Sequence, residues 1–298
     1  MKFTEYKIFA YTLPLLQPFG KREGLILEIN NAQGGKSWGE IAPLPGRSRE
    51  TLKEALEQLT AALKGETLPA LFPSVQFGLQ SALSWHTPQQ PIPVCALLAG
   101  TPDEIRNQAE QAKRSGYKTA KVKLAHLPIA VARQLILELQ SQFHLRIDLN
   151  RALSFDKTTE LFSEIEPSYA YIEEPTREIQ RLGQFPFPFA LDESLLELSE
   201  IPATSHLKAL VIKPSLIALP ATKSSIVLSS SFETGIGILG IMHLAAELGL
   251  QDTAHGLDTH RFLEHDLLIE PLQFKDGCVH APKKVALNYN LLHEVAHA

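Results

Sequence analysis

Five charged residues stand at the ends of apolar segments and recur at nearly even intervals along the chain. Each segment is typical of a buried strand, where a charge is costly unless it has a partner. The steps between the five residues are 25, 25, 19 and 21 positions, each about one strand plus one helix. The five are Lys123, Asp148, Glu173, Asp192 and Lys213. Their regular spacing predicts that they converge on one site.

The three middle members of this series are carboxylates, and together they suit a hard metal ion. Asp148, Glu173 and Asp192 would repel one another strongly at short range unless a cation lay between them. A ligand set made only of oxygen, without Cys or His, favours Mg²⁺ or Mn²⁺, ions that keep positions open for water or substrate. The sequence therefore predicts Mg²⁺ as cofactor, with Mn²⁺ as the alternative ion.

The two outer members are lysines that would face each other across the metal. A lysine with an ordinary pKa near ~10.4 is a poor base at neutral pH, and catalytic lysines are tuned to about 7–8. Lys121 lies two residues before Lys123, and Arg146 two residues before Asp148. By strand alternation they share the same faces, so both are candidates to lower the pKa of Lys123. The reaction class that needs this set is abstraction of a proton next to a carboxylate held by the metal.

Other polar residues have simpler interpretations. Glu174 and Glu193 adjoin two of the carboxylates, and we expect them to point the opposite way and to be structural or to support the metal ligands from behind. The histidines at 255, 260 and 265 form no metal-binding helix pattern, although His255 stands near a predicted strand end. The serines at 229–231 lack the G-x-S-x-G pattern of a hydrolase.

The elements that must position the five charges begin only after residue 90. Residues 2–45 predict three strands with turns at PLLQPFGKRE and NNAQGG, followed by helices at about 49–64 and 75–85. This segregated order is typical of an α+β domain. Residues 87–93, TPQQPIP, then predict a linker.

From residue 93 onward strands and helices alternate, which indicates a parallel sheet, and eight strands indicate a barrel. Thr101 opens a helix with a capping box, Ser154 opens another, and a third is expected near 240–248. Only 16 positions separate Lys213 from Ser229, so we expect the sixth helix to be lost or reduced to one turn. The glycines of ETGIG are a weak signal for N–H groups that meet an anion at a helix start.

The predicted fold class is thus α/β, with an N-terminal α+β capping domain (1–90) and a modified TIM-type (β/α) barrel (91–270) whose sixth βα unit is shortened. The segment at about 271–298 is a candidate to pack back on the capping domain. With 298 residues and a net charge of −5, the chain gives no reason to expect nucleic acid or a membrane as partner. Two distant cysteines and a poor signal peptide predict a cytoplasmic protein. The sequence leaves monomer and homo-oligomer open.

The ordered Lys-Asp-Glu-Asp-Lys set resembles the enolase superfamily, in particular its muconate cycloisomerase-like branch. The motifs GEIAPLPGRSRET, SSSFETGIG and AHGLDT are similar to those of the o-succinylbenzoate synthase family. That resemblance implies Mg²⁺-dependent dehydration of 2-succinyl-6-hydroxy-2,4-cyclohexadiene-1-carboxylate to 2-succinylbenzoate, a step of menaquinone or phylloquinone biosynthesis. The implied partner is a small-molecule carboxylate.

The resemblance also implies roles for the five charged residues. Lys123 would remove the proton alpha to the ring carboxylate and, as its conjugate acid, assist departure of the hydroxyl group. Asp148, Glu173 and Asp192 would hold Mg²⁺. Lys213 would offer cationic stabilisation from the other side of the substrate.

A further set of substrate-binding or supporting residues follows from the same resemblance. A capping loop around Leu13–Arg22 would close over the succinyl tail and exclude water. The residues of this set are Lys121, Arg146, Asn150, Ser229, Ser230 and Arg22.

Alternative functions remain open at this point. A racemase of N-acylamino acids or a dipeptide epimerase would use the same lysine pair, although dipeptide epimerases usually show an Asp-x-Asp at the eighth strand that 256–259 lacks. A Schiff-base aldolase would not explain three carboxylates in a row. A binding protein without activity would not need both Lys123 and Lys213.

Overall fold

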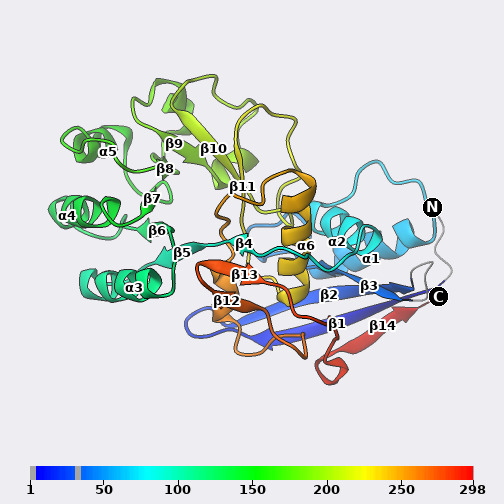
Figure 1. The fold of residues 1–298 in the computed structure, drawn as a ribbon. Coiled ribbons are helices and arrows are strands. Elements are labelled where there is room, and N and C mark those ends of the chain that lie inside the picture. The colour runs from blue at the N-terminus through cyan, green and yellow to red at the C-terminus, as the bar shows by residue number, and fades with distance from the viewer. Residues whose placement is uncertain (1–4, 31–34, 298) are drawn as a thin grey trace.

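The computed structural model describes residues 5–30 and 35–297 of the chain (Figure 1). Its N-terminal part is a four-stranded antiparallel sheet in the order β14-β1-β2-β3. The strands are β1 (Tyr6–Pro14), β2 (Lys21–Asn30), β3 (Lys36–Ile41) and, from the other end of the chain, β14 (His293–His297). The first three were predicted; the turn expected at NNAQGG lies mostly outside the described residues.

Two helices, α1 (Leu52–Leu63) and α2 (Pro73–Leu83), pack on this sheet and form its core. Alternate residues of β1 and β2, such as Ile8 and Leu27, meet the apolar stripe of α1, where Leu59 and Leu63 are fully buried. Helix α2 lies very close to β3, since a Cβ atom on Gly39 would stand 1.8 Å from the carbonyl oxygen of Gly78. A glycine at position 39 is therefore required for this packing.

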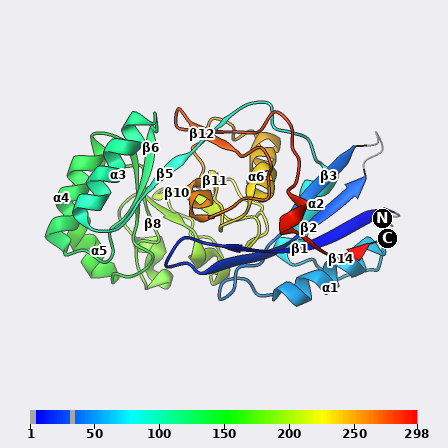
Figure 2. The same cartoon turned by 90° about the horizontal axis from the view of Figure 1, so that it is seen from below.

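Seven parallel strands follow in sequence order and make the wall of a barrel (Figure 2). They are β5 (Cys95–Leu98), β6 (Thr119–Lys123), β7 (His144–Asp148), β8 (Tyr171–Glu173), β9 (Phe189–Leu191), β10 (Leu207–Ile212) and β11 (Ile226–Leu228). The expected eighth strand is reduced to two bridging residues. His255 bridges Val94 and Gly256 bridges Ser229, both in parallel, and these bridges close the ring.

Three helices, α3 (Pro102–Arg114), α4 (Ile129–Gln140) and α5 (Phe155–Phe162), cover the outside of the first four barrel strands (Figure 1, left). Thr101 makes the predicted capping box, and Ser154 caps α5 as expected. The next two connections hold only 3-10 helices, Ile179–Gln184 and Glu193–Leu196. Between β10 and β11, where every residue is described, there is no helix, which confirms the shortened sixth unit.

Helix α6 (Gly235–Glu247) joins the barrel to the capping domain. It begins at Gly235, earlier than the predicted start near residue 240, because Thr234 caps it and the glycines form its first turns. A Cβ atom on Gly237 would stand 2.7 Å from a carboxylate oxygen of Glu40, and one on Gly240 would stand 2.8 Å from Ser81 Oγ. The glycines thus allow α6 to approach β3 and α2, beside which it lies in Figure 2.

The C-terminal segment contacts both parts of the chain. Its strands β12 (Gln273–Lys275) and β13 (Cys278–His280) form a small sheet with β4 (Ile92–Pro93), just before the barrel. Farther on, β14 pairs with β1 of the capping sheet. The domain boundaries at residues 90 and 270 stay predictions.

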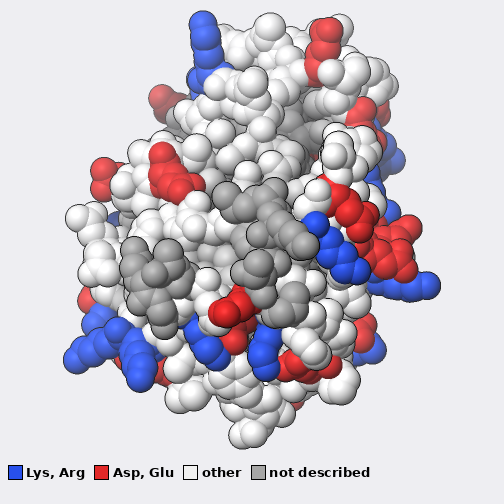
Figure 3. Space-filling model, turned by 90° about the vertical axis from the view of Figure 1, so that its right-hand side faces the viewer, with Lys and Arg blue, Asp and Glu red and all other residues white. Residues whose placement is uncertain are grey.

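The surface around the chain termini carries charges of both signs. Figure 3 shows Lys and Arg side chains interspersed with Asp and Glu over this face. Among the described residues, no helix combines the length and the apolar character needed to cross a membrane.

Candidate active site

The five charged residues of the series lie at the carboxyl ends of successive barrel strands. Lys123 on β6 stands in register with Asp148 on β7, which stands in register with Glu173 on β8. Asp192 directly follows β9, and Lys213 directly follows β10. All five line one cavity of about 430 Å³. The carboxyl end of the strands is where barrel enzymes have their active sites.

Lysines neutralise the three carboxylates inside this cavity. The Lys121 ammonium lies 3.0 Å from Asp148 Oδ2 and 2.7 Å from Glu173 Oε1. The Lys123 ammonium lies 3.1 Å from the same Asp148 oxygen. Lys213 forms an ion pair with Asp192. Three buried carboxylates and three ammonium groups thus form a balanced cluster, which is the condition for burying charge at tolerable cost.

The pKa values of the cluster follow from burial and from these ion pairs. Burial alone would lower the pKa of Lys121, but the attraction of Asp148 and Glu173 raises it well above 10.5. Burial would raise the pKa of Asp148, but Lys121 and Lys123 hold it at about 2. Burial raises the pKa of Glu173 to about 7, with Lys121 opposing and the Asp148 charge adding to the rise. Lys121 therefore keeps its proton, and a further cation beside Glu173 would favour the charged form of that carboxyl group.

The carboxylate oxygens of the cavity suit a divalent cation by their chemistry and by the strand register that brings them side by side. Carboxylate oxygens are the ligands that Mg²⁺ prefers. Asp148 Oδ2 is buried and makes ion pairs but accepts no regular hydrogen bond, so a metal ion would satisfy it. In the described residues no three acidic, His or Cys side chains stand close enough together to hold an ion as they are. A bound metal ion would therefore compete with the lysine ammonium groups for the carboxylate oxygens.

Backbone strain marks the residues directly after the strand ends. Asn150 and Glu174 have positive φ angles of 43° and 49°, in the left-handed region that non-glycine residues seldom adopt. Asn150 donates its N–H to Asp148 Oδ1 at 3.0 Å, and its amide oxygen accepts from Lys123 at 2.8 Å. Asn150 therefore orients one carboxylate and one lysine of the cluster. A role of Asn150 in supporting a metal ion stays a prediction.

Glu174 and Glu193, expected to point away from the cavity, differ in the structure. The Glu174 carboxylate accepts hydrogen bonds from the N–H groups of Asp192 and Ser194 at 2.6 and 2.9 Å and does not line the cavity. It is structural, as predicted. Glu193 does line the cavity, because the 3-10 helix that starts at this residue turns it toward the opening, so this prediction is wrong.

Arg146 forms part of the cavity floor. It stands opposite Lys121 in the register of β6 and β7, and it is 6% exposed. Its guanidinium lies 5.4 Å from the ring centroid of Tyr171, a cation–π contact. Its Nε is buried without a hydrogen-bond partner. The effect of Arg146 on Lys123 stays a prediction.

Ser229 and Ser230 line the cavity with their hydroxyl groups already engaged. They donate to the carbonyl of Gly256 at 3.2 and 3.1 Å, and Ser230 also shares a 2.5 Å hydrogen bond with Thr259. These bonds reinforce the bridge that closes the barrel. Contact of the two serines with substrate stays a prediction.

Arg22 lies behind the site and does not line the cavity. The side chain is 1% exposed and donates to the carbonyl groups of Ala42, Pro43 (2.7 Å) and Phe232 (3.3 Å). All these acceptors are backbone carbonyls, so Arg22 ties the end of β3 to the loop after β11. Of the two roles predicted for Arg22, substrate contact or support, these contacts favour support, and its role stays a prediction.

An aromatic cluster over the cavity was not predicted from the sequence. The ring of Phe19 lies 5.2 Å from that of Phe232 and 4.9 Å from that of Phe262. The capping loop that carries Phe19 is held down by hydrogen bonds from Leu16 N–H to the Phe262 carbonyl (2.8 Å) and from Glu264 N–H to the Pro14 carbonyl (3.1 Å). Phe19 and Phe232 lie in two separate loops and Phe262 ends a short 3-10 helix, so the three carry no periodic signal and only the fold could reveal them.

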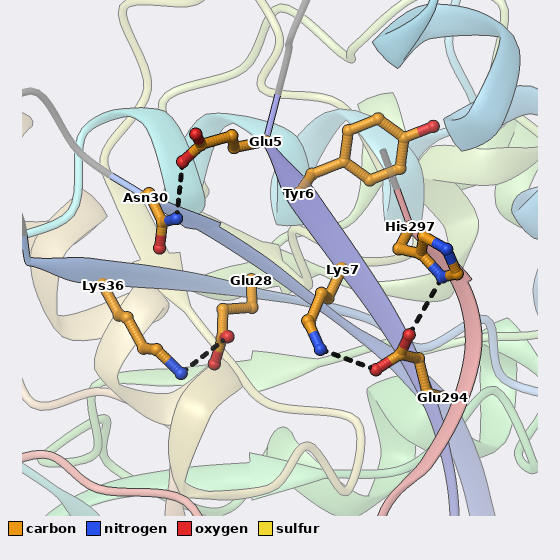
Figure 4. Close-up of a pocket in the computed structure, with 8 residues that line it drawn as sticks. All are labelled: Glu5, Tyr6, Lys7, Glu28, Asn30, Lys36, Glu294 and His297. Carbon is orange, nitrogen blue, oxygen red and sulfur yellow. Dashed lines mark hydrogen bonds and ion pairs between the residues drawn. The ribbon is translucent and has the colours of Figure 1, made fainter.

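A second hollow, of about 380 Å³, lies on the capping sheet near the chain termini (Figure 4). Its charged side chains pair with one another: Lys36 with Glu28 and Lys7 with Glu294, both at 2.9 Å. The Lys7–Glu294 pair is exposed and contributes little free energy, whereas Glu28 of the other pair is buried. No residue of the five-charge series lines this hollow.

Comparison with known proteins supports one family. The family model for the N-terminal domain of MenC matches residues 3–85. The o-succinylbenzoate synthase of Pasteurella multocida is 30% identical, with 89% of this chain and 91% of that protein covered. The o-succinylbenzoate synthase of Klebsiella pneumoniae is 34% identical, with 83% and 86% covered.

Solved structures share the fold over nearly the whole chain. A member of the enolase superfamily from Roseovarius nubinhibens superposes with a TM-score of 0.78 at 19% identity, covering 99% and 96% of the two chains. The o-succinylbenzoate synthase of Thermosynechococcus elongatus, complexed with magnesium in its active site, gives 0.70 at 22% identity, covering 91% and 97%. The L-Ala-D/L-Glu epimerase of Bacillus subtilis gives 0.74 at 18% identity, covering 100% of both chains. From the curated relatives and this shared fold it follows that the chain is a dehydrating lyase that belongs to the o-succinylbenzoate synthase family of the enolase superfamily.

Proposed function

We propose that the protein dehydrates 2-succinyl-6-hydroxy-2,4-cyclohexadiene-1-carboxylate to 2-succinylbenzoate, as a step of menaquinone or phylloquinone biosynthesis in the cytoplasm. The observation that carries the proposal is a single cavity in which lysines flank three carboxylates at the barrel strand ends. Curated relatives that bear the name of this activity support it.

Mg²⁺ is the proposed cofactor, and Asp148, Glu173 and Asp192 are the proposed ligands. An o-succinylbenzoate synthase of the same fold has been solved with magnesium in its active site. When bound, the ion would hold the ring carboxylate of the substrate and stabilise the negative charge that builds up on it.

Lys123 is the proposed base because it is less constrained than Lys121. Lys121 lies between two carboxylates, and its raised pKa keeps it protonated. Lys123 pairs with Asp148 alone, and 36% of its side chain is exposed at the cavity. Its neighbour Asn150 orients the nitrogen by accepting a 2.8 Å hydrogen bond.

The proposed reaction balances in two steps. Lys123 takes the proton from the ring carbon that bears the carboxylate, and the electron pair of that C–H bond moves toward the carboxylate. The pair then returns to form the new ring double bond while the C–O bond on the neighbouring carbon breaks. The proton on Lys123 joins the departing hydroxyl group, which leaves as water. Lys213, on the opposite side of the carboxylates, stabilises the negative charge of the intermediate.

The test is turnover of the cyclohexadiene substrate by purified protein with Mg²⁺. We expect its diene absorbance to fall as 2-succinylbenzoate appears in equal amount. Absence of turnover by folded, metal-loaded protein would contradict the proposed synthase activity.

A second candidate is racemisation of N-acylamino acids or epimerisation of dipeptides. It is favoured by the lysines on both sides of the carboxylates, which offer one base for each face of a substrate. The fold shared with an L-Ala-D/L-Glu epimerase supports it. Incubation with an N-acylamino acid in D₂O distinguishes the two, since a racemase exchanges the alpha proton for deuterium and inverts the centre.

A further inference from the structure

Five cationic side chains among the described residues line the active-site cavity, and four of them are engaged. Lys121, Lys123 and Lys213 form ion pairs with the carboxylates. Arg146 is buried in the floor, where its guanidinium lies against the ring of Tyr171. The fifth is Arg47, whose guanidinium makes no hydrogen bond or ion pair with any described residue.

Arg47 is presented by an ordered turn of the capping domain. Its own N–H donates to the Leu44 carbonyl at 3.0 Å, and Ser48 N–H donates to the same carbonyl at 2.8 Å. The hydroxyl of Ser48 accepts from Leu44 N–H at 2.8 Å. Buried Arg22 holds the residues at the foot of this turn through the carbonyl groups of Ala42 and Pro43. The backbone at Arg47 is thus fixed where it reaches the cavity.

The other residues that line the cavity favour an anion as the partner of Arg47. Phe19, Phe232 and Phe262 supply apolar walls in the part of the cavity nearest the capping loop. The hydroxyl groups of Ser229 and Ser230 donate to a backbone carbonyl. Arg47 itself is exposed to solvent, and a ligand that covers it together with these apolar walls would lower the local dielectric constant and strengthen the attraction between opposite charges. A second negative group of the ligand would therefore meet Arg47 as the exposed cation of this lining, whose guanidinium has no hydrogen-bond or ion-pair partner among the described residues.

We propose that Arg47 binds the distal carboxylate of a dicarboxylate substrate and selects for it. This inference rests on the proposed function, whose substrate carries one carboxylate on the ring and another at the end of the succinyl tail. With the ring carboxylate held at the strand ends, the tail extends toward the capping loop. The planar guanidinium matches a carboxylate with two parallel hydrogen bonds. Arg47 touches no reacting carbon, so it supplies the same binding energy to the ground state and the transition state.

The test compares Arg47→Gln with wild type in steady-state kinetics. We expect KM to rise about 10- to 100-fold, as for loss of a charged hydrogen-bonded pair, with kcat within about twofold. Arg47→Lys keeps the positive charge but lacks the paired N–H donors of the guanidinium, so it should recover part of the lost affinity. Arg49→Gln is the matched control, because Arg49 is exposed on the same segment, does not line the cavity and carries the same charge.

Calorimetry with two ligands identifies the group that Arg47 contacts. The Arg47→Gln change should weaken binding of 2-succinylbenzoate but leave unchanged the binding of its ester at the distal acid. Equal weakening for both ligands, or an unchanged KM, would overturn the assignment of Arg47. Failure of wild type to turn over the diene would instead remove the proposed function, whatever Arg47→Gln does.

Discussion

Two groups of buried carboxylates differ in what they bind, although both are almost completely shielded from solvent. The strand-end group, Asp148, Glu173 and Asp192, pairs with lysine side chains inside the cavity. The joint group comprises Glu40 and Glu233, which lie where α6 meets the capping domain. Their partners are N–H and hydroxyl donors of the surrounding fold, such as Thr234 N–H at 3.0 Å and Ser231 Oγ at 2.7 Å.

Glu40 shows the joint type of partner most fully. It accepts from Thr234 Oγ1 at 2.6 Å, Gly237 N–H at 2.8 Å and Tyr11 Oη at 2.5 Å. Burial and the nearby Glu233 charge raise its pKa. Two glycine N–H groups at the start of α6 thus meet anions, but both anions are side chains of the protein itself: Gly237 donates to Glu40, and Gly235 donates to Asp266 at 2.8 Å.

This difference shows that the role of a buried carboxylate depends more on the groups it binds than on how deeply it is buried. A flexible lysine side chain moves aside when a metal ion or substrate competes for the carboxylate. A backbone N–H at a helix start has no such freedom. The strand-end carboxylates can therefore exchange a lysine partner for a metal ion or substrate, whereas the carboxylates of the joint group keep their partners.

The largest effect is expected from Lys123→Ala. Loss of the proposed base should lower kcat by about 10³- to 10⁴-fold, while the three carboxylates stay in place and calorimetry still detects Mg²⁺ binding. Lys118→Ala, an exposed lysine just before the same strand, is the control and should retain full turnover. Near-normal turnover in Lys123→Ala would assign the base elsewhere.

Glu40→Ala should destabilise the fold by about 3–5 kcal/mol, because it leaves buried donors of the joint without an acceptor. Chemical denaturation followed by circular dichroism measures this loss. Glu40→Gln keeps the shape and some acceptor capacity and should lose less. A wild-type stability for Glu40→Ala would remove the distinction between fixed and exchangeable carboxylates.

Mg²⁺ should stabilise wild type through the strand-end group alone. At a hundred times its dissociation constant, a ligand of the folded state adds about 2.7 kcal/mol. We expect the rise in Tm to disappear in Asp148→Asn and to persist in Glu174→Gln, whose carboxylate binds backbone N–H groups instead of lysine. A rise that survives Asp148→Asn would place the metal ion elsewhere.

His255 predicts a smaller, pH-dependent effect at the closure of the barrel. Burial lowers its pKa to about 4, and its Nδ1 accepts from Leu228 N–H at 3.1 Å. Because the folded pKa lies below the unfolded value near 6.5, the unfolded state binds the proton first. Stability should therefore fall as pH drops from about 6.5 toward 4, by about 2 kcal/mol at pH 5.

The measurement for His255 is urea denaturation at pH 8 and pH 5. In His255→Gln the part of the pH dependence due to this group should vanish, whatever the variant's absolute stability. His265→Gln, which changes an exposed histidine of the same region, should keep the wild-type pH dependence. An unchanged slope in His255→Gln would show that the ring is not kept neutral by burial.

Local sequence predicted those parts of the molecule that repeat along the chain. The helix starts at Thr101 and Ser154 depend on residues within a few positions, so they were correct. The start of α6 was misplaced because its glycines are poor helix formers alone, and only the close approach of Glu40 and Ser81 requires them. The eighth strand was overestimated because two bridging residues are enough to close the ring.

What the sequence by itself determined is the ordered set of five charges, since strand alternation and the βα repeat bring residues at strand ends to one rim. What only the tertiary structure decided is how residues from distant segments meet there. Arg22 turned out to hold backbone carbonyls, and the Arg47 guanidinium turned out to line the cavity with no hydrogen-bond or ion-pair partner in the described part of the chain. Both stand in irregular segments, where side-chain direction depends on long-range packing and no periodicity reveals it.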